Sequence, residues 1–373
     1  MSDNPFGGLF GDIFKILGQQ GPDAWFETAR TLGLNVARGA DGDPNPAVAE
    51  RQRLEQFAPL VARHLSTAFS ISVASDVDAA NRTQGTLAAL DQWRPLIRPM
   101  LDAPAADFGD ELGDSGATLG QLASTIGPLF TGFQLGSVGG HFFERAWSLA
   151  TLPLPRDNDK RFLVVNNVAK FANEWSLGPD SAIVFALARE FIASVVLTQP
   201  GTSDALRALL HDAVTDAAAA QGDIMSRLSK MASPDEIASL MSNPESLLDG
   251  LEMPDETPAT RSMNAAAAVL RAFFDASAFH VTELILGPQP LLREAYLRYR
   301  LADARGEDAA AALFGIDNHG EFQTAADDFV QHIVEAHGLA AFTALLRADG
   351  LPSHDEVTKP AEWFDRVSNS PLA

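Results

Sequence analysis

The chain has 373 residues, 46% of them hydrophobic, with no cysteine and a formal net charge of −22. This length allows one large domain or two ordinary ones, and the lack of cysteine excludes disulfides, thiolate catalysis and Cys-ligated metal. The acidic balance, 49 Asp and Glu against 27 Lys and Arg, disfavours nucleic acids and anionic membrane surfaces as partners, because both repel a negatively charged protein.

The N-terminal segment, residues 5–18, is rich in phenylalanine and glycine, and its spacing predicts a short amphipathic helix. This helix either docks on a partner or folds back on the protein. The segment before it lacks the basic region of a secretory signal. No uncharged apolar run reaches the length of about 18 residues that a membrane span requires. We therefore expect no transmembrane segment and a cytoplasmic location.

The next part of the chain is predicted to contain a loop followed by two helices. A dense run of Gly, Asp, Pro and Asn at residues 39–46 predicts a loop, and it lacks the spaced oxygen ligands of a calcium-binding EF-hand loop. Hydrophobic periodicity predicts helices over residues 46–70 and 81–101, the second interrupted by Pro95 and Pro99.

A helical pattern over residues 119–149 carries Gly132, Gly136 and Gly140 at every fourth position. Each glycine costs a helix up to about 1 kcal/mol relative to alanine. Since these glycines leave one face of the helix smooth, we expect another element to pack closely against that face.

Helix is also the dominant prediction for the rest of the chain. Residues 162–165 are the clearest strand candidate. The remaining helical patterns cover residues 179–197, 205–230, 265–286, 291–313, 322–337 and 339–348. Residues 353–372 form a tail that we expect to pack through Trp363, Phe364 and Val367.

These patterns predict a mainly α fold with at most one or two short strands. The acidic, glycine-containing segment 102–115 is the best candidate for an internal boundary. We therefore divide the chain into an arm and loop at 1–45, an N-terminal helical region at 46–115 and a helical domain at 116–373.

Residues 189–193, Arg-Glu-Phe-Ile-Ala, are the most informative motif, and they lie within the predicted helix at 179–197. In zinc peptidases such a helix carries His-Glu-x-x-His, in which two histidines on one face bind zinc and the glutamate activates water. Glu190 occupies the position of that glutamate. Arg189 cannot release a proton to bind a metal, and Ala193 has no donor atom.

Around this helix the chain resembles the bacterial, mainly actinobacterial, family of zincin-like metallopeptidases. Some members of that family carry Arg-Glu-x-x-His in place of His-Glu-x-x-His. The resemblance covers roughly residues 120–370 and rests on the segments 129–140, 152–155, 164–171, 187–190, 292–298 and 361–367. It implies a zincin-like helical body with an N-terminal helical extension.

The resemblance also implies a third metal ligand, a glutamate on a downstream helix. The matching segment, residues 274–281, places Asp275 at that position. Zinc needs three or four donors, whereas this chain offers at most Asp275, so we expect neither a bound metal nor another cofactor. We expect Arg189 to pair with Glu190, Asp275 or both, which would relieve the repulsion between the two acids. His141 is the one histidine that could approach this site.

One further cluster combines basic and aromatic residues: Arg298, Arg300 and Arg305 with Tyr296 and Tyr299. Acidic residues follow it closely in the sequence. They favour ordinary ion pairs on a helix surface over an anion-binding site.

The leading hypothesis is a non-catalytic relative of a zinc peptidase that binds a protein or peptide. Arg189, Glu190, Ala193 and Asp275 would then be a vestigial site. One alternative is an atypical hydrolase or peptidase that uses Glu190 as its base with unidentified metal ligands. Another is a scaffold that docks through the phenylalanine-rich N-terminus.

Overall fold

The computed structural model describes residues 23–40, 42–102, 131–213, 257–302, 304–318 and 322–370. Over these ranges the chain is mainly α, as predicted. The predicted N-terminal helix at 5–18 and residues 103–115 of the predicted boundary lie outside the described residues. The predicted strand is present as β2 (Phe162–Val164), and it pairs in parallel with β1 (Asp78–Ala80), which the sequence patterns did not predict.

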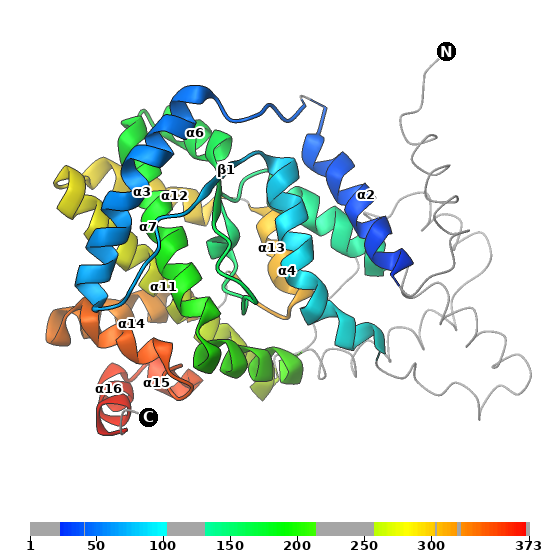
Figure 1. The fold of residues 1–373 in the computed structure, drawn as a ribbon. Coiled ribbons are helices and arrows are strands. Elements are labelled where there is room, and N and C mark those ends of the chain that lie inside the picture. The colour runs from blue at the N-terminus through cyan, green and yellow to red at the C-terminus, as the bar shows by residue number, and fades with distance from the viewer. Residues whose placement is uncertain are drawn as a thin grey trace, which may run out of the picture.

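Two long helices, α7 (Pro179–Thr198) and α11 (Pro258–Leu286), pack against each other at the centre of the fold (Figure 1). Both begin with proline at the first helical position, where its missing N–H costs nothing. On α7 every residue from Ala182 to Leu197 is buried. Taken singly, α7 is the one described helix long and apolar enough to cross a membrane, but 89% of that apolar window is buried inside the protein. It is therefore the core helix of this fold.

Other helices cover the central pair. The first, α3 (Val48–Phe69), contacts both α7 and α11, and α6 (Val165–Glu174) contacts α7. On α11 lies α14 (Phe322–His337), whose bounds match the prediction. Sequence patterns did not predict α6 as a helix.

Helix α2 (Ala24–Arg38) packs against α4 (Arg82–Asp102) and against the helical residues 131–142. A Cβ atom added at Gly132 would lie 2.2 Å from the carbonyl oxygen of Trp25, and one at Gly136 would lie 2.4 Å from that of Ala29. Both distances are too short for any side chain. The predicted close packing on the glycine face is therefore confirmed, and the partner is α2.

The loop before α3 caps the N-terminal end of α4 with hydrogen bonds. Both carboxylate oxygens of Asp43 accept backbone hydrogen bonds, from Arg82 at 3.1 Å and from Thr83 at 2.7 Å. These bonds satisfy N–H groups at a helix start that would otherwise lack partners. The α4 helix then continues through Pro95 and Pro99, so the interruptions that the sequence predicts there are absent.

Some predicted helices have different bounds. Residues 143–148 do not continue the helix predicted over 119–149, and a short 3-10 helix, η1 (Leu149–Thr151), follows them. The single helix predicted over 291–313 is two helices, α12 (Pro290–Leu301) and α13 (Arg305–Leu313). The helix predicted over 339–348 is a 3-10 helix, η2 (Leu339–Leu346). Residues 200–213 are helical, which covers the part of the helix predicted over 205–230 that lies within the described residues.

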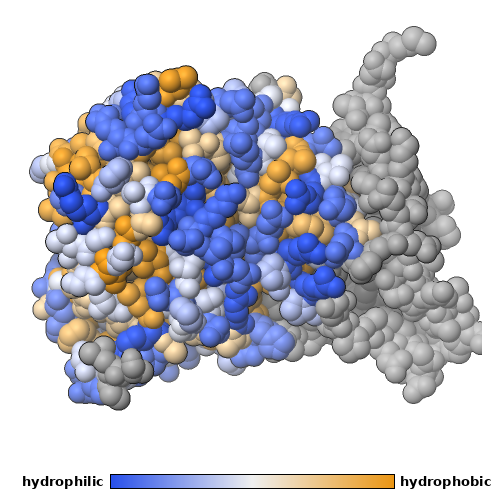
Figure 2. Space-filling view, viewed as in Figure 1, coloured by the Kyte–Doolittle hydropathy of each residue, from blue (hydrophilic) through white to orange (hydrophobic). Residues whose placement is uncertain are grey.

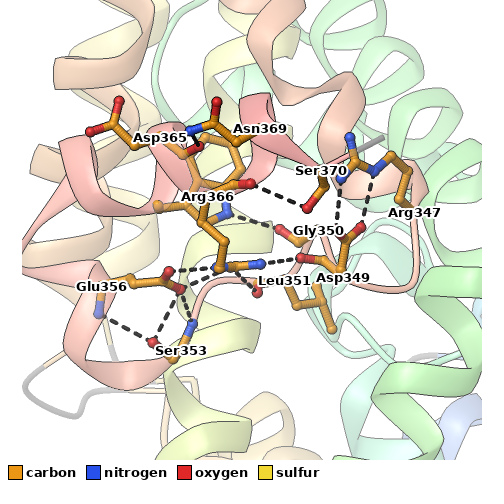
Figure 3. Close-up of polar contacts among 11 residues, drawn as sticks. Arg347, Asp349, Gly350, Leu351, Ser353, Glu356, Asp365, Arg366, Asn369 and Ser370 are labelled. Carbon is orange, nitrogen blue, oxygen red and sulfur yellow. Dashed lines mark hydrogen bonds and ion pairs between the residues drawn. The ribbon is translucent and has the colours of Figure 1, made fainter. Parts of the chain in front are cut away.

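The C-terminal tail forms α15 (His354–Val357) and α16 (Pro360–Asn369). As predicted, Trp363 is fully buried, and its indole Nε1 donates to the carbonyl oxygen of Gly350 at 2.9 Å. Figure 3 shows Arg366 reaching from α16 to Glu356, 2.6 Å from Nε to Oε1, and to the carbonyl oxygen of Leu351 at 3.1 Å. These contacts, with the Arg347–Asp349 ion pair beside them, hold the tail on the body, and we call them the C-terminal clamp.

One hydrophobic core runs through the described residues. It includes Trp25 and Leu54 from the N-terminal helices as well as Phe273 and Phe329 from the later ones. The visible face alternates hydrophilic and hydrophobic patches without one continuous apolar surface (Figure 2). The division into three parts stays a prediction.

Candidate functional site

Arg189 and Asp275 meet between the two central helices. Arg189 on α7 donates from Nε to Oδ1 of Asp275 on α11 across 2.6 Å. Arg189 is 6% exposed and Asp275 is 4% exposed. The predicted pairing of position 189 with Asp275 is confirmed.

Asp275 is bonded on both of its carboxylate oxygens. The Tyr296 hydroxyl donates to Oδ1 at 2.9 Å, and Arg300 Nη1 donates to Oδ2 at 3.1 Å. Both residues lie on α12, and Arg300 also pairs with Asp327 on α14. Four helices thus contribute to one polar network, which we call the central network.

The pKa values in the central network follow from burial and charge. Burial raises the pKa of the Tyr296 hydroxyl above its usual value, although Arg189 opposes that shift. Burial alone would lower the pKa of Arg189, but the charge of Asp275 and its hydrogen bond to Arg189 act in the opposite direction, and that pKa is raised. Tyr296 is therefore a neutral donor, and Arg189 a permanent cation.

Glu190 has a different partner. Its two oxygens accept from Nη1 and Nη2 of Arg156, at 2.6 and 3.1 Å. Glu190 is fully buried and Arg156 is 4% exposed. Consecutive residues on a helix point about 100° apart, so Arg189 and Glu190 face different neighbours. The two acids therefore do not share one cation.

Arg156 is a partner of Glu190 that the sequence patterns do not predict. It directly follows the Leu-Pro-Leu-Pro segment that we had singled out for its resemblance, and its backbone N–H donates to the carbonyl oxygen of Leu197 at 3.0 Å. A buried Glu190 on an apolar helix required a cation, and that requirement was the one available signal.

Two other predicted site residues take no part in the central network. Ala193 is fully buried in the apolar core. His141 lies at the surface, where its Nδ1 is 2.8 Å from Oε1 of Glu144. The structure thus brings together Arg189 and Asp275, and it places Glu190 in a second, separate pair.

The cluster of Tyr296, Tyr299 and the nearby arginines differs from our prediction. Arg298 forms the expected surface pair with Glu294 at 2.6 Å. Tyr296 is buried, and Arg300 joins the central network. The buried residues of α12 are Leu292, Ala295 and Tyr296, whereas Arg298 is exposed, so the members of this cluster lie on different faces of one helix.

Beside Arg189 lies a cavity of about 50 Å³. We call it the arginine cavity, because Arg189, Arg271 and Arg300 all line it, together with Glu307 and other polar residues. Burial, and then repulsion by Arg300, lower the pKa of Arg271 to about 10. Burial raises the pKa of Glu307 to about 7, against the opposing effects of Arg145 and Arg189.

The donor set does not fit zinc. In the part of the chain that the structure describes, no group of three or more His, Cys, Asp and Glu side chains could hold a metal ion. Glu190 and Asp275 are instead each held by guanidinium groups. A zinc ion close to them would have to displace those cations, and zinc needs three or four donors of its own.

The Arg-Glu pair on which the sequence resemblance rested lies within the buried helix α7. The family of zincin-like metallopeptidases matches residues 25–364, and the chain belongs to that family. The match begins in α2, so it extends over the N-terminal helices as well as the later segments that carried the resemblance.

Among solved structures, the fold is similar to that of a candidate hydrolase with a novel fold from Chloroflexus aurantiacus. The TM-score is 0.59 at 14% identity, over 93% of this chain and 99% of that one. At this identity the likeness concerns the fold. No curated protein matches the chain.

Proposed function

We propose that the chain is a non-catalytic member of the zincin-like family that binds a protein or peptide. The observation that carries the proposal is the pairing of both acids with arginine. Glu190 is held by Arg156 through two hydrogen bonds, and Asp275 by Arg189 and Arg300.

A general base needs a free lone pair near its substrate. Each carboxylate oxygen of Glu190 accepts a hydrogen bond from one Nη atom of Arg156, in an apolar environment where the pair is buried away from solvent. Removing the cation would leave an uncompensated buried charge, which typically costs about 3 to 5 kcal/mol. Glu190 therefore acts as a structural counter-ion.

The family relationship supports a peptide as the ligand. A peptidase fold carries a surface shaped for a polypeptide, and loss of a metal ligand does not by itself remove that surface. Next to the central network, the arginine cavity presents Trp147 and Tyr299 together with polar side chains. Aromatic and arginine side chains are the residue types that most often anchor binding partners.

Metal content and hydrolysis test the proposal together. We expect protein purified with zinc in all buffers to retain far less than one zinc per chain, measured by elemental analysis. It should also leave a mixed peptide library uncleaved, as followed by mass spectrometry. Stoichiometric zinc would contradict the proposal.

A Glu190→Gln variant separates the proposal from an atypical hydrolase. Cleavage by the wild type that this variant loses, and that a surface Glu144→Gln control keeps, would establish Glu190 as a base. In that case the alternative in which Glu190 is catalytic would replace the non-catalytic one.

A further inference from the structure

Three arginines line the arginine cavity, and the acids around it do not take up all of their donors. Asp275 and Asp327 take up the Nε of Arg189 and the Nη atoms of Arg300. Arg271 has no carboxylate partner among the described residues, and its Nη1 donates to the amide oxygen of Asn318. It is 6% exposed, so its charge is buried without an opposite charge in direct contact.

Several donors at the cavity have no hydrogen-bond partner. Within the described residues these are the buried Nε atoms of Arg271 and Arg300, the indole Nε1 of Trp147 and the buried amide nitrogen of Gln323. All four side chains line the cavity. A buried donor without an acceptor costs about 1 to 3 kcal/mol, and more when the group is charged. Native proteins satisfy such groups in most cases, so this set is suited to an acceptor from outside the chain.

We propose that the arginine cavity binds the carboxylate group of a peptide, with Arg271 as its principal cation. This inference rests on the proposed function, because that function supplies the peptide whose carboxylate would bind. It adds the ligand group that the site recognises. Arg189 contributes to the cavity wall while it stays paired with Asp275.

Size and shape favour a carboxylate. The cavity volume of about 50 Å³ is several times the minimum for one water molecule, which suits a small planar anion. Guanidinium groups match the two oxygens of a carboxylate with parallel donors. The cavity wall also includes partly exposed Asp308, Asn318 and Gln323, which give the cavity an outer edge in contact with solvent.

The charge of the protein opposes anion binding at long range, so a carboxylate must be held by short-range contacts in the cavity. The chain as a whole carries −22, so it repels anions at long range. The acids of the cavity wall, Glu307 and Asp308, oppose an incoming carboxylate. Asp308 already accepts a hydrogen bond from Asn318 at 3.1 Å. Binding therefore depends on Arg271 and on the unpaired donors rather than on the overall field.

Calorimetric titration with short acetylated alanine peptides tests the proposal. One peptide has a free C-terminal carboxylate, a second is amidated, and a third is amidated with a central glutamate; inorganic phosphate is the fourth probe. We expect one-to-one binding of the first or the third peptide, and that result identifies the source of the carboxylate. The amidated alanine peptide should not bind.

Variants identify the donors. Arg271→Met keeps the length of the side chain and should weaken binding about tenfold or more, as loss of a charge-assisted bond predicts. Gln323→Leu, which leaves the arginines in place, should weaken it about threefold, and it serves if Arg271→Met fails to fold. The exposed Arg298→Met is the matched control, with binding unchanged.

Three results would overturn this inference: phosphate as the sole ligand, equal binding of the amidated alanine peptide, or equal losses in Arg271→Met and Arg298→Met. Absence of all binding by a zinc-free protein would also overturn it and leave the non-catalytic proposal intact. Stoichiometric zinc would remove the proposed function instead, so the two failures are distinguishable.

Discussion

The central network and the C-terminal clamp use the same side chains in opposite surroundings. Both join arginine to carboxylate at 2.6 Å, Arg189 to Asp275 in one and Arg366 to Glu356 in the other. The side chains of the central pair are 7% and 6% exposed, whereas those of Arg366 and Glu356 are 37% and 12% exposed. Desolvation makes loss of one partner severe in a buried pair, and water compensates such a loss at the surface.

The largest predicted effect is that of Asp275→Ala, which breaks the central network. Arg189, Arg300 and Tyr296 would then lose their shared acceptor. We expect the free energy of unfolding to fall by about 3 to 5 kcal/mol, measured by urea denaturation. The exposed Asp328→Ala on α14 is the control and should change it by less than about 0.5 kcal/mol. A loss below about 1 kcal/mol for Asp275→Ala would show that water replaces the carboxylate.

The second effect concerns the Arg156–Glu190 pair. Glu190→Leu leaves Arg156 buried without a partner, and Arg156→Met leaves Glu190 in the same condition. Each should lower stability by about 3 to 5 kcal/mol. The double variant should lose less than either single one, because it removes both charges. Additive losses in this double-mutant cycle would contradict direct pairing.

Glu307 provides a pH-dependent test. Its pKa is raised from 4.5 to about 7, so the folded state binds more protons than the unfolded state between these values, and stability falls as pH rises through that range. The full penalty, on the order of 1 to 3 kcal/mol, is present above pH 7 and absent below pH 4.5.

Glu307→Gln should therefore raise the melting temperature at pH 8 more than at pH 5. The charged groups that face Glu307 are Arg145, Arg189, Arg271 and Asp308. The exposed Glu55→Gln is the control, and its melting temperature should change little. An equal shift for Glu307→Gln at both pH values would refute the assignment.

The smallest effect belongs to the C-terminal clamp. Arg347 lowers the pKa of Asp349 to about 2, with help from Ser370, so this stabilisation is present at neutral pH and is lost as pH falls toward 2. Arg347→Ala should lower stability by less than about 1 kcal/mol. The difference should shrink further at molar salt, which screens exposed charges. A loss as large as that of Asp275→Ala would erase the distinction between the two networks.

The sequence predicted most of the long helices, and one-sided burial gives helices such as α14 a regular apolar period. It predicted α7 and α14 closely, and it predicted β2 but missed its three-residue partner β1. It also joined α12 to α13, since no proline or glycine marks the break at Ala302.

The site was predicted in part. The resemblance gave Asp275 as one of two expected partners of Arg189, and the two side chains meet although they are 86 residues apart. Arg156 and Tyr296 could not be predicted in the same way. Their partners Glu190 and Asp275 lie 34 and 21 residues away, and no local pattern reports which distant side chains meet.

The contact between α2 and the helical residues 131–142 has a kinetic consequence. Because Gly132 and Gly136 touch the backbone of α2 directly, no flexible side chain cushions the joint, and partial separation would expose bare peptide groups on both helices at once. We therefore expect amide hydrogens of α2 and of residues 131–142 to exchange with deuterium together, in a single opening event, rather than one helix fraying ahead of the other.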